Sequence, residues 1–143
     1  MLDYKTLDFI ADIYTPLLLL ALIILMARSI FAAEWPRSRC EFFLLCYGFI
    51  VIYGLMLVDQ LFSIWPSIGL DYSTHTAAAL LVVILLCLLQ PSLQKISWGS
   101  FLIYALLMRY QHYHTVTDMV STAIVSGALF IPVAQKFIRV YSE

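Results

Sequence analysis

Long runs of apolar residues, separated by short polar stretches, dominate this chain. The apolar runs cover residues 16–33, 42–58, 75–90, 96–110 and 116–137. A transmembrane helix needs about 20 mostly apolar residues to cross the hydrocarbon core of a bilayer, and the first, second and fifth runs reach or approach that length. Because lipid offers no partners to backbone polar groups, we expect all five runs to be helices.

The pattern therefore predicts an all-α fold. We expect a polytopic membrane helix bundle with about five transmembrane helices, forming a single membrane-embedded domain over residues 1–143. The runs 75–90 and 96–110 are short for a span, which indicates that one end lies below the membrane surface, where an active-site cleft can form. Residues 1–14 mix apolar and acidic side chains, which predicts either a short interfacial amphipathic helix or a frayed terminus.

The composition agrees with a membrane protein. Hydrophobic residues make up 63% of the chain and charged residues 12%, against about 45–50% and about 25% in ordinary soluble chains. The net charge of −1 excludes a nucleic-acid binder, and the apolar content excludes a disordered chain. Cys40, Cys46 and Cys87 are widely spaced, so neither a disulfide framework nor a cysteine metal site is predicted.

Charges in the polar stretches predict the orientation. Six basic residues lie near or after the carboxyl ends of the first, third and fifth runs, namely Arg28, Arg37, Arg39, Lys95, Lys136 and Arg139. By the positive-inside rule these residues face the cytoplasm, so the amino terminus is expected outside. The acidic first fourteen residues are unlike a cleavable signal peptide. These features suit an integral protein of a bacterial inner membrane.

All three histidines lie in or beside the two outer connections. His75 begins the third run after Asp71, and His112 and His114 lie between the fourth and fifth runs, after Arg109. Both connections are expected on the same side of the membrane, so the two clusters can meet. Ionisable groups at this depth are costly, and they mark a functional site by default.

The spacing of His114 and Asp118 predicts a catalytic pair. If the last helix begins near His114, the two side chains share one helix face, and the carboxylate can orient the imidazole. Two histidines with Arg109 suit phosphoryl transfer. One imidazole attacks phosphorus, the other protonates the leaving oxygen, and the guanidinium binds the phosphoryl oxygens.

Two stretches resemble signatures of the type 2 phosphatidic acid phosphatase superfamily. Ser73-Thr74-His75 is similar to its Pro-Ser-Gly-His pattern, and Arg109 with His114-x-x-x-Asp118 is similar to its Ser-Arg-x5-His-x3-Asp pattern. The resemblance implies that His114 becomes phosphohistidine, that Asp118 orients it, and that His75 is the acid. It also implies that Ser73, the backbone amides around Thr74, and Arg109 hold the phosphate.

The chain departs from these patterns at several positions. Tyr72 and Thr74 stand where the family has proline and glycine, and four residues rather than five separate Arg109 from His114. The family's basic first signature is absent before Pro66. Sphingomyelin synthase-like phosphotransferases also lack that signature, and their Ser-Gly-His-Thr and His-Tyr-Thr-x-Asp stretches are similar to this chain.

The resemblance implies a membrane lipid phosphatase acting on a lipid phosphate or diphosphate at the outer face, without a metal or other cofactor. Its partners would be the bilayer and the lipid, with a protein partner left open. One alternative is a lipid phosphotransferase with an alcohol acceptor. Another is a non-catalytic membrane subunit that keeps the fold. A third hypothesis is a metal-dependent enzyme whose site is made of His75, His112, His114 and an aspartate.

Overall fold

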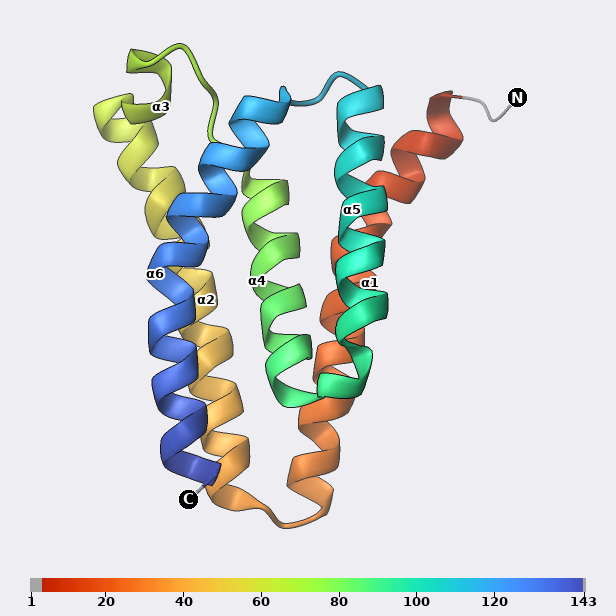
Figure 1. Cartoon of the computed structure of the whole chain (residues 1–143), viewed down its shortest axis with the longest axis vertical. Coiled ribbons are helices and arrows are strands. Elements are labelled where there is room, and N and C mark those ends of the chain that lie inside the picture. The colour runs from red at the N-terminus through yellow and green to blue at the C-terminus, as the bar shows by residue number, and fades with distance from the viewer. Residues whose placement is uncertain (1–3, 143) are drawn as a thin grey trace.

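A computed structural model describes residues 4–142, and within this range the chain is helical with no strand. The long helices are α1 (Tyr4–Phe31), α2 (Trp35–Phe62), α4 (Thr74–Leu89), α5 (Gln94–Tyr110) and α6 (Val116–Ser142). A short helix, α3 (Ile64–Ser67), follows α2, and a 3₁₀ turn, η1 (Pro91–Leu93), joins α4 to α5. The prediction of an all-α fold is confirmed, with each apolar run lying in its own long helix (Figure 1).

Three of these helices are long and apolar enough to cross a membrane. They are α1 and α2, with 28 residues each, and α6, with 27 residues. The helices α4 and α5 have 16 and 17 residues, fewer than the about 20 that a span needs. The described residues therefore contain three candidate membrane spans, and α4 is a shorter apolar helix packed against all of them.

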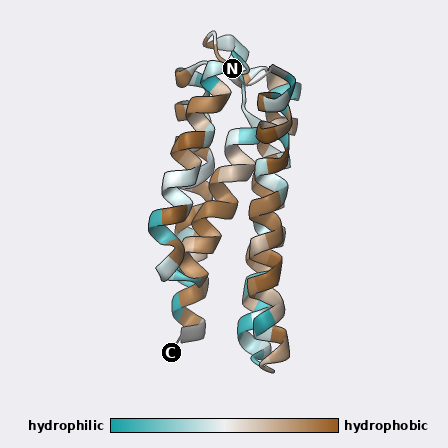
Figure 2. Ribbon diagram, turned by 90° about the vertical axis from the view of Figure 1, so that its right-hand side faces the viewer, coloured by the Kyte–Doolittle hydropathy of each residue, from teal (hydrophilic) through white to brown (hydrophobic). Residues whose placement is uncertain are grey.

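The core of the bundle is built around α4. This helix packs against α1, α2, α5 and α6, and its side chains from Ala79 to Leu86 are all buried. A helix that is apolar on every side must be covered on every side. Figure 2 shows the result from the side, with hydrophobic residues along the middle of the helices and hydrophilic residues gathered near their ends.

The amino-terminal segment does not form the separate interfacial helix that was one of the two predictions for residues 1–14. Residues 4–14 are the first turns of α1 and continue through Pro16 without a break, so no separate interfacial helix exists in the described part. Residues 1–3 of that predicted segment lie outside the described residues. The first turns of α1 lean away from the bundle (Figure 1).

The amino end of α4 lies deeper in the bundle than the ends of the helices around it. Figure 1 shows the chain descending from α3, so that α4 begins below the upper ends of α2, α5 and α6. This arrangement agrees with the short length of α4. The start of α4 and the connection between α5 and α6 lie at the same end of the bundle, and the sequence places the histidines there.

Candidate active site

Ser73 shapes the start of α4 from a fully buried position. Its hydroxyl donates to Thr76 Oγ1 at 2.9 Å and accepts from the Thr76 backbone N–H at 3.3 Å, which is the N-cap interaction. Its own backbone N–H donates to Thr122 Oγ1 on α6 at 3.1 Å. The hydroxyl is thus engaged within the protein, whereas the resemblance implies that it contacts phosphate. Thr74, the first residue of α4, is half-buried.

Asp118 joins the connection that leads into α4 to the connection that leads into α6. One carboxylate oxygen accepts from the Asp71 backbone N–H at 2.9 Å, and the other accepts from the Thr115 backbone N–H at 2.8 Å. The Asp118 N–H in turn donates to Thr115 Oγ1 at 3.2 Å, which completes a reciprocal cap at the start of α6. The buried carboxylate therefore fixes the backbone on both sides of the site.

The expected hydrogen bond between His114 and Asp118 is absent from the described residues. The expectation placed both residues on one helix, but α6 begins at Val116, two residues after His114. His114 thus lies in the connection, and the carboxylate turns toward backbone amides instead. The two side chains interact only through their charges.

His114 and His75 lie close enough to influence one another. Burial lowers the pKa of His114, the charge of Asp118 opposes this effect, and the nearby His75 adds to it. The His114 side chain is half-buried, and its Nδ1 is buried without a hydrogen-bond partner. His75 is exposed. The structure therefore brings together one imidazole whose pKa is lowered by burial and one that solvent can reach.

Arg109 lies at the same end of the bundle, but its side chain contacts His112 rather than His75 or His114. Its Nη1 approaches His112 Nδ1 at 3.4 Å, and both side chains are exposed. His112 has a left-handed backbone, with φ of 59°, which turns the chain after α5. No hydrogen bond between Arg109 and His75 or His114 occurs among residues 4–142.

Asp8 on α1 was not predicted to belong to this region. Its carboxylate accepts from Gln111 Nε2 at 3.2 Å and from the Tyr113 hydroxyl. The amino-terminal part of α1 therefore holds the connection that carries His112 and His114. More than a hundred positions separate these partners along the chain, so no local pattern indicates the contact.

Trp65 on α3 and Tyr72, which lies just before α4, pack against one another with their ring centroids 5.1 Å apart. The buried Trp65 indole donates to Ser121 Oγ at 3.0 Å, and its backbone N–H donates to Asp59 Oδ1 at 2.8 Å. The Tyr72 hydroxyl donates to the Ile52 carbonyl at 2.9 Å, and burial raises the pKa of Tyr72 to about 12, with the Asp59 charge contributing. Asp59 thus supports α3 and forms no ion pair with Arg109 in the described range.

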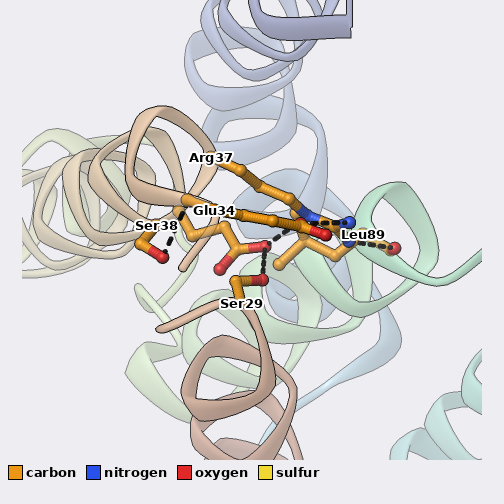
Figure 3. Close-up of polar contacts among 6 residues, drawn as sticks. Ser29, Glu34, Arg37, Ser38 and Leu89 are labelled. Carbon is orange, nitrogen blue, oxygen red and sulfur yellow. Dashed lines mark hydrogen bonds and ion pairs between the residues drawn. The ribbon is translucent and has the colours of Figure 1, made fainter. Parts of the chain in front are cut away.

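A second polar cluster lies at the other end of the bundle, away from the histidines. Glu41 is only 2% exposed, and its Oε1 accepts from Ser29 Oγ at 3.0 Å and from Arg37 Nε at 2.9 Å. Arg37 also donates to Glu34 at 3.2 Å and to the Leu89 carbonyl at 3.4 Å (Figure 3). This network ties α1, α2 and the carboxyl end of α4 together.

No group of three or more His, Cys, Asp or Glu side chains within residues 4–142 has the spacing to hold a metal ion. The arrangement of the histidines therefore gives no support to the hypothesis of a metal-dependent enzyme.

Comparisons with known proteins add no relative. No protein-family model matches the chain, and no curated protein or solved structure gives a significant match. The likeness to the phosphatidic acid phosphatase superfamily accordingly rests on the two stretches of sequence alone.

Proposed function

We propose that this protein is an integral membrane lipid phosphatase, which removes phosphate from a lipid phosphate or diphosphate through a phosphohistidine intermediate. One observation carries the proposal. Half-buried His114, whose pKa burial lowers, lies within electrostatic range of exposed His75, the second residue of α4. In this account all five long helices cross a bacterial inner membrane, and the site faces the periplasm.

In the first step, His114 attacks phosphorus. Its Nδ1 is buried, so the attacking atom is Nε2 on the other edge of the ring. A nitrogen–phosphorus bond forms and the bond from phosphorus to the lipid oxygen breaks. His75, in its imidazolium form, gives its proton to that oxygen.

In the second step, a water molecule attacks the phosphohistidine. His75 takes the proton from the water, the nitrogen–phosphorus bond breaks, and His114 returns to its neutral state. One lipid phosphate and one water thus yield one lipid alcohol and one phosphate. A neutral nucleophile beside a second titratable imidazole is the arrangement that this sequence of steps needs.

Arg109 and the start of α4 bind the phosphoryl oxygens in this proposal. The guanidinium supplies charge and paired donors, and the free backbone amides near Thr74 attract an anion because they belong to a helix amino terminus. Ser73 acts indirectly, since its buried hydroxyl caps that helix. Asp118 positions the backbone and lends negative charge, which stabilises a positively charged His114.

A lipid phosphotransferase is the second candidate. It is favoured by the shortage of bases, because Arg109 is the one base in the outer connections and the superfamily's first basic signature is missing. Here an alcohol replaces water in the second step. Adding a lipid alcohol to the assay separates the two, because a phosphotransferase forms a new lipid phosphate while a phosphatase releases inorganic phosphate.

The test is phosphate release from a panel of lipid phosphates by the detergent-purified protein. His114→Ala and His75→Ala should each lose at least about a hundredfold in rate, as expected for a nucleophile and a positioned acid. His112→Asn is the matched control, because asparagine tolerates the left-handed backbone there. Unchanged release by His114→Ala would overturn the assignment. Inhibition by vanadate and indifference to EDTA are also expected.

A further inference from the structure

A long apolar groove lies directly below the connection that carries the histidines. It has a volume of about 400 Å³, and α4, α5 and α6 line it, with Thr76, Phe101, Ala105, Arg109, Val116 and Val120 among its residues. The helices α5 and α6 stand apart with α4 behind them (Figure 1), so that α4 forms the back of the groove. The groove is therefore recessed between helices. A second apolar pocket, between α1 and α2, is lined by no residue of the connection that carries the histidines or of the ends that flank it.

The two ends of the groove differ in chemistry. Arg109 ends α5 and Val116 begins α6, so the outer end lies at the connection with His112 and His114. The walls below this end are apolar except for Thr76, the residue after His75. A groove with one cationic end and apolar walls complements an amphiphile that has an anionic head and a hydrocarbon tail.

The length of the groove matches one leaflet. Phe101 and Arg109 are eight residues apart on α5, which corresponds to about 12 Å along a helix. The hydrocarbon core of a bilayer is about 30 Å thick, so one leaflet is about 15 Å deep. A lipid with its phosphate at the outer surface can therefore place its chain along the whole groove.

We infer that this groove holds the hydrocarbon chain of the substrate, and that the substrate presents one chain between α5 and α6 with its phosphate beside Arg109. This inference rests on the proposed function for its phosphate end. The chain gains little from leaving lipid for an apolar groove. The groove instead orients the phosphate, since holding a reactant in place can supply much of the rate.

The experiment compares decyl phosphate with methyl phosphate, which has no chain to hold. Ala105→Phe fills the groove from its α5 wall, and Leu106→Trp narrows it from an exposed rim position where folding tolerates a large side chain. Ala128→Phe is the matched control, because Ala128 is exposed on α6 and does not line the groove. Methyl phosphate hydrolysis shows whether each variant keeps a folded site.

Both groove variants should lose about tenfold or more in kcat/KM for decyl phosphate, with no more than about twofold change for methyl phosphate. Ala128→Phe should match the wild type on both substrates. Equal losses on both substrates, or an unchanged preference for the chain, would overturn the inference while leaving the phosphatase proposal standing. The groove variants could instead change their oligomeric state and keep the wild-type preference for decyl phosphate. That result would also overturn the inference, because it would assign the groove to a second copy of this chain.

If the wild type hydrolyses neither these compounds nor any lipid phosphate of the panel, the proposed function fails, and binding then tests the groove on its own. Native mass spectrometry with decyl phosphate should show one lipid bound to the wild type and to Ala128→Phe. Loss of that lipid in Ala105→Phe would support the groove, and equal binding by all three proteins would contradict it.

Discussion

The Asp118 carboxylate accepts the backbone N–H of Asp71 at 2.9 Å, and through this bond the start of α6 holds the segment that leads into α4. The two histidines therefore approach one another because a buried acid fixes both connections. Asp118 is a positioning residue in this account, because its oxygens accept from backbone amides and no hydrogen bond joins them to His114.

Replacing Asp118 by asparagine should destabilise the protein. The amide can supply only one acceptor oxygen, and its NH₂ group faces a backbone N–H, so a cost of about 2 kcal/mol is expected. Thermal unfolding in detergent measures the change. Asp71→Asn is the control, because Asp71 contributes its backbone N–H and its side chain is exposed. Equal stability of the two variants would contradict the assigned role.

The pH dependence of activity should reflect the lowered pKa of His114. Histidine ordinarily has a pKa of about 6.5, and burial lowers that of His114. The attacking imidazole must be neutral, so kcat/KM should decrease on the acid side with a midpoint below a pH of about 6.5. Asp118→Asn removes a charge that raises the pKa of His114, and should move this loss further toward acid.

The pH dependence of folding stability should also reflect the lowered pKa of His114. Protonation of His114 favours the unfolded chain, because its pKa is higher there. The contribution of neutral His114 is therefore present above pH of about 6.5 and is lost as the pH falls through the lower folded-state pKa. His114→Gln should flatten this part of the stability profile, and an unchanged slope would contradict the sign of the shift.

Asp8 should restrain the connection between α5 and α6. Asp8→Ala removes the acceptor of Gln111 and Tyr113, so hydrogen exchange in residues 111–115 should quicken. We expect kcat to fall by about threefold to tenfold, because the histidines are held less firmly. Asp12 lies one turn further along α1, is exposed, and makes no hydrogen bond to that connection in the described residues. The control variant Asp12→Ala should therefore behave as the wild type does.

Glu41 should matter for stability and not for chemistry. Glu41→Gln leaves Arg37 without its buried ionic partner, and a loss of about 2 kcal/mol or more is expected on thermal unfolding. Glu34→Gln, which breaks an exposed pair with the same arginine, should cost less than about 1 kcal/mol. The histidine site lies at the opposite end, so the rate measured on folded Glu41→Gln should be unchanged.

The sequence predicted the helices well because their apolar runs are long and uninterrupted. The capping role of Asp118 could have been predicted in part, because the stretch Thr115-Val116-Thr117-Asp118 matches a capping box. The interpretation as an i, i+4 pair with His114 required α6 to begin earlier than it does. The contacts of Asp8, Trp65 and Glu41 depend on which helices become neighbours, and spacing along the chain carries no signal for that.

The measurement that tests the central claim most directly is the site of phosphorylation during turnover. The purified protein is mixed with a lipid phosphate, stopped in alkali to preserve phosphohistidine, and mapped by mass spectrometry. The account predicts a phosphoryl group on His114, which accumulates in His75→Ala when a substrate with a good leaving group is used. Phosphate release with the label on His112, or with no labelled histidine, would contradict it.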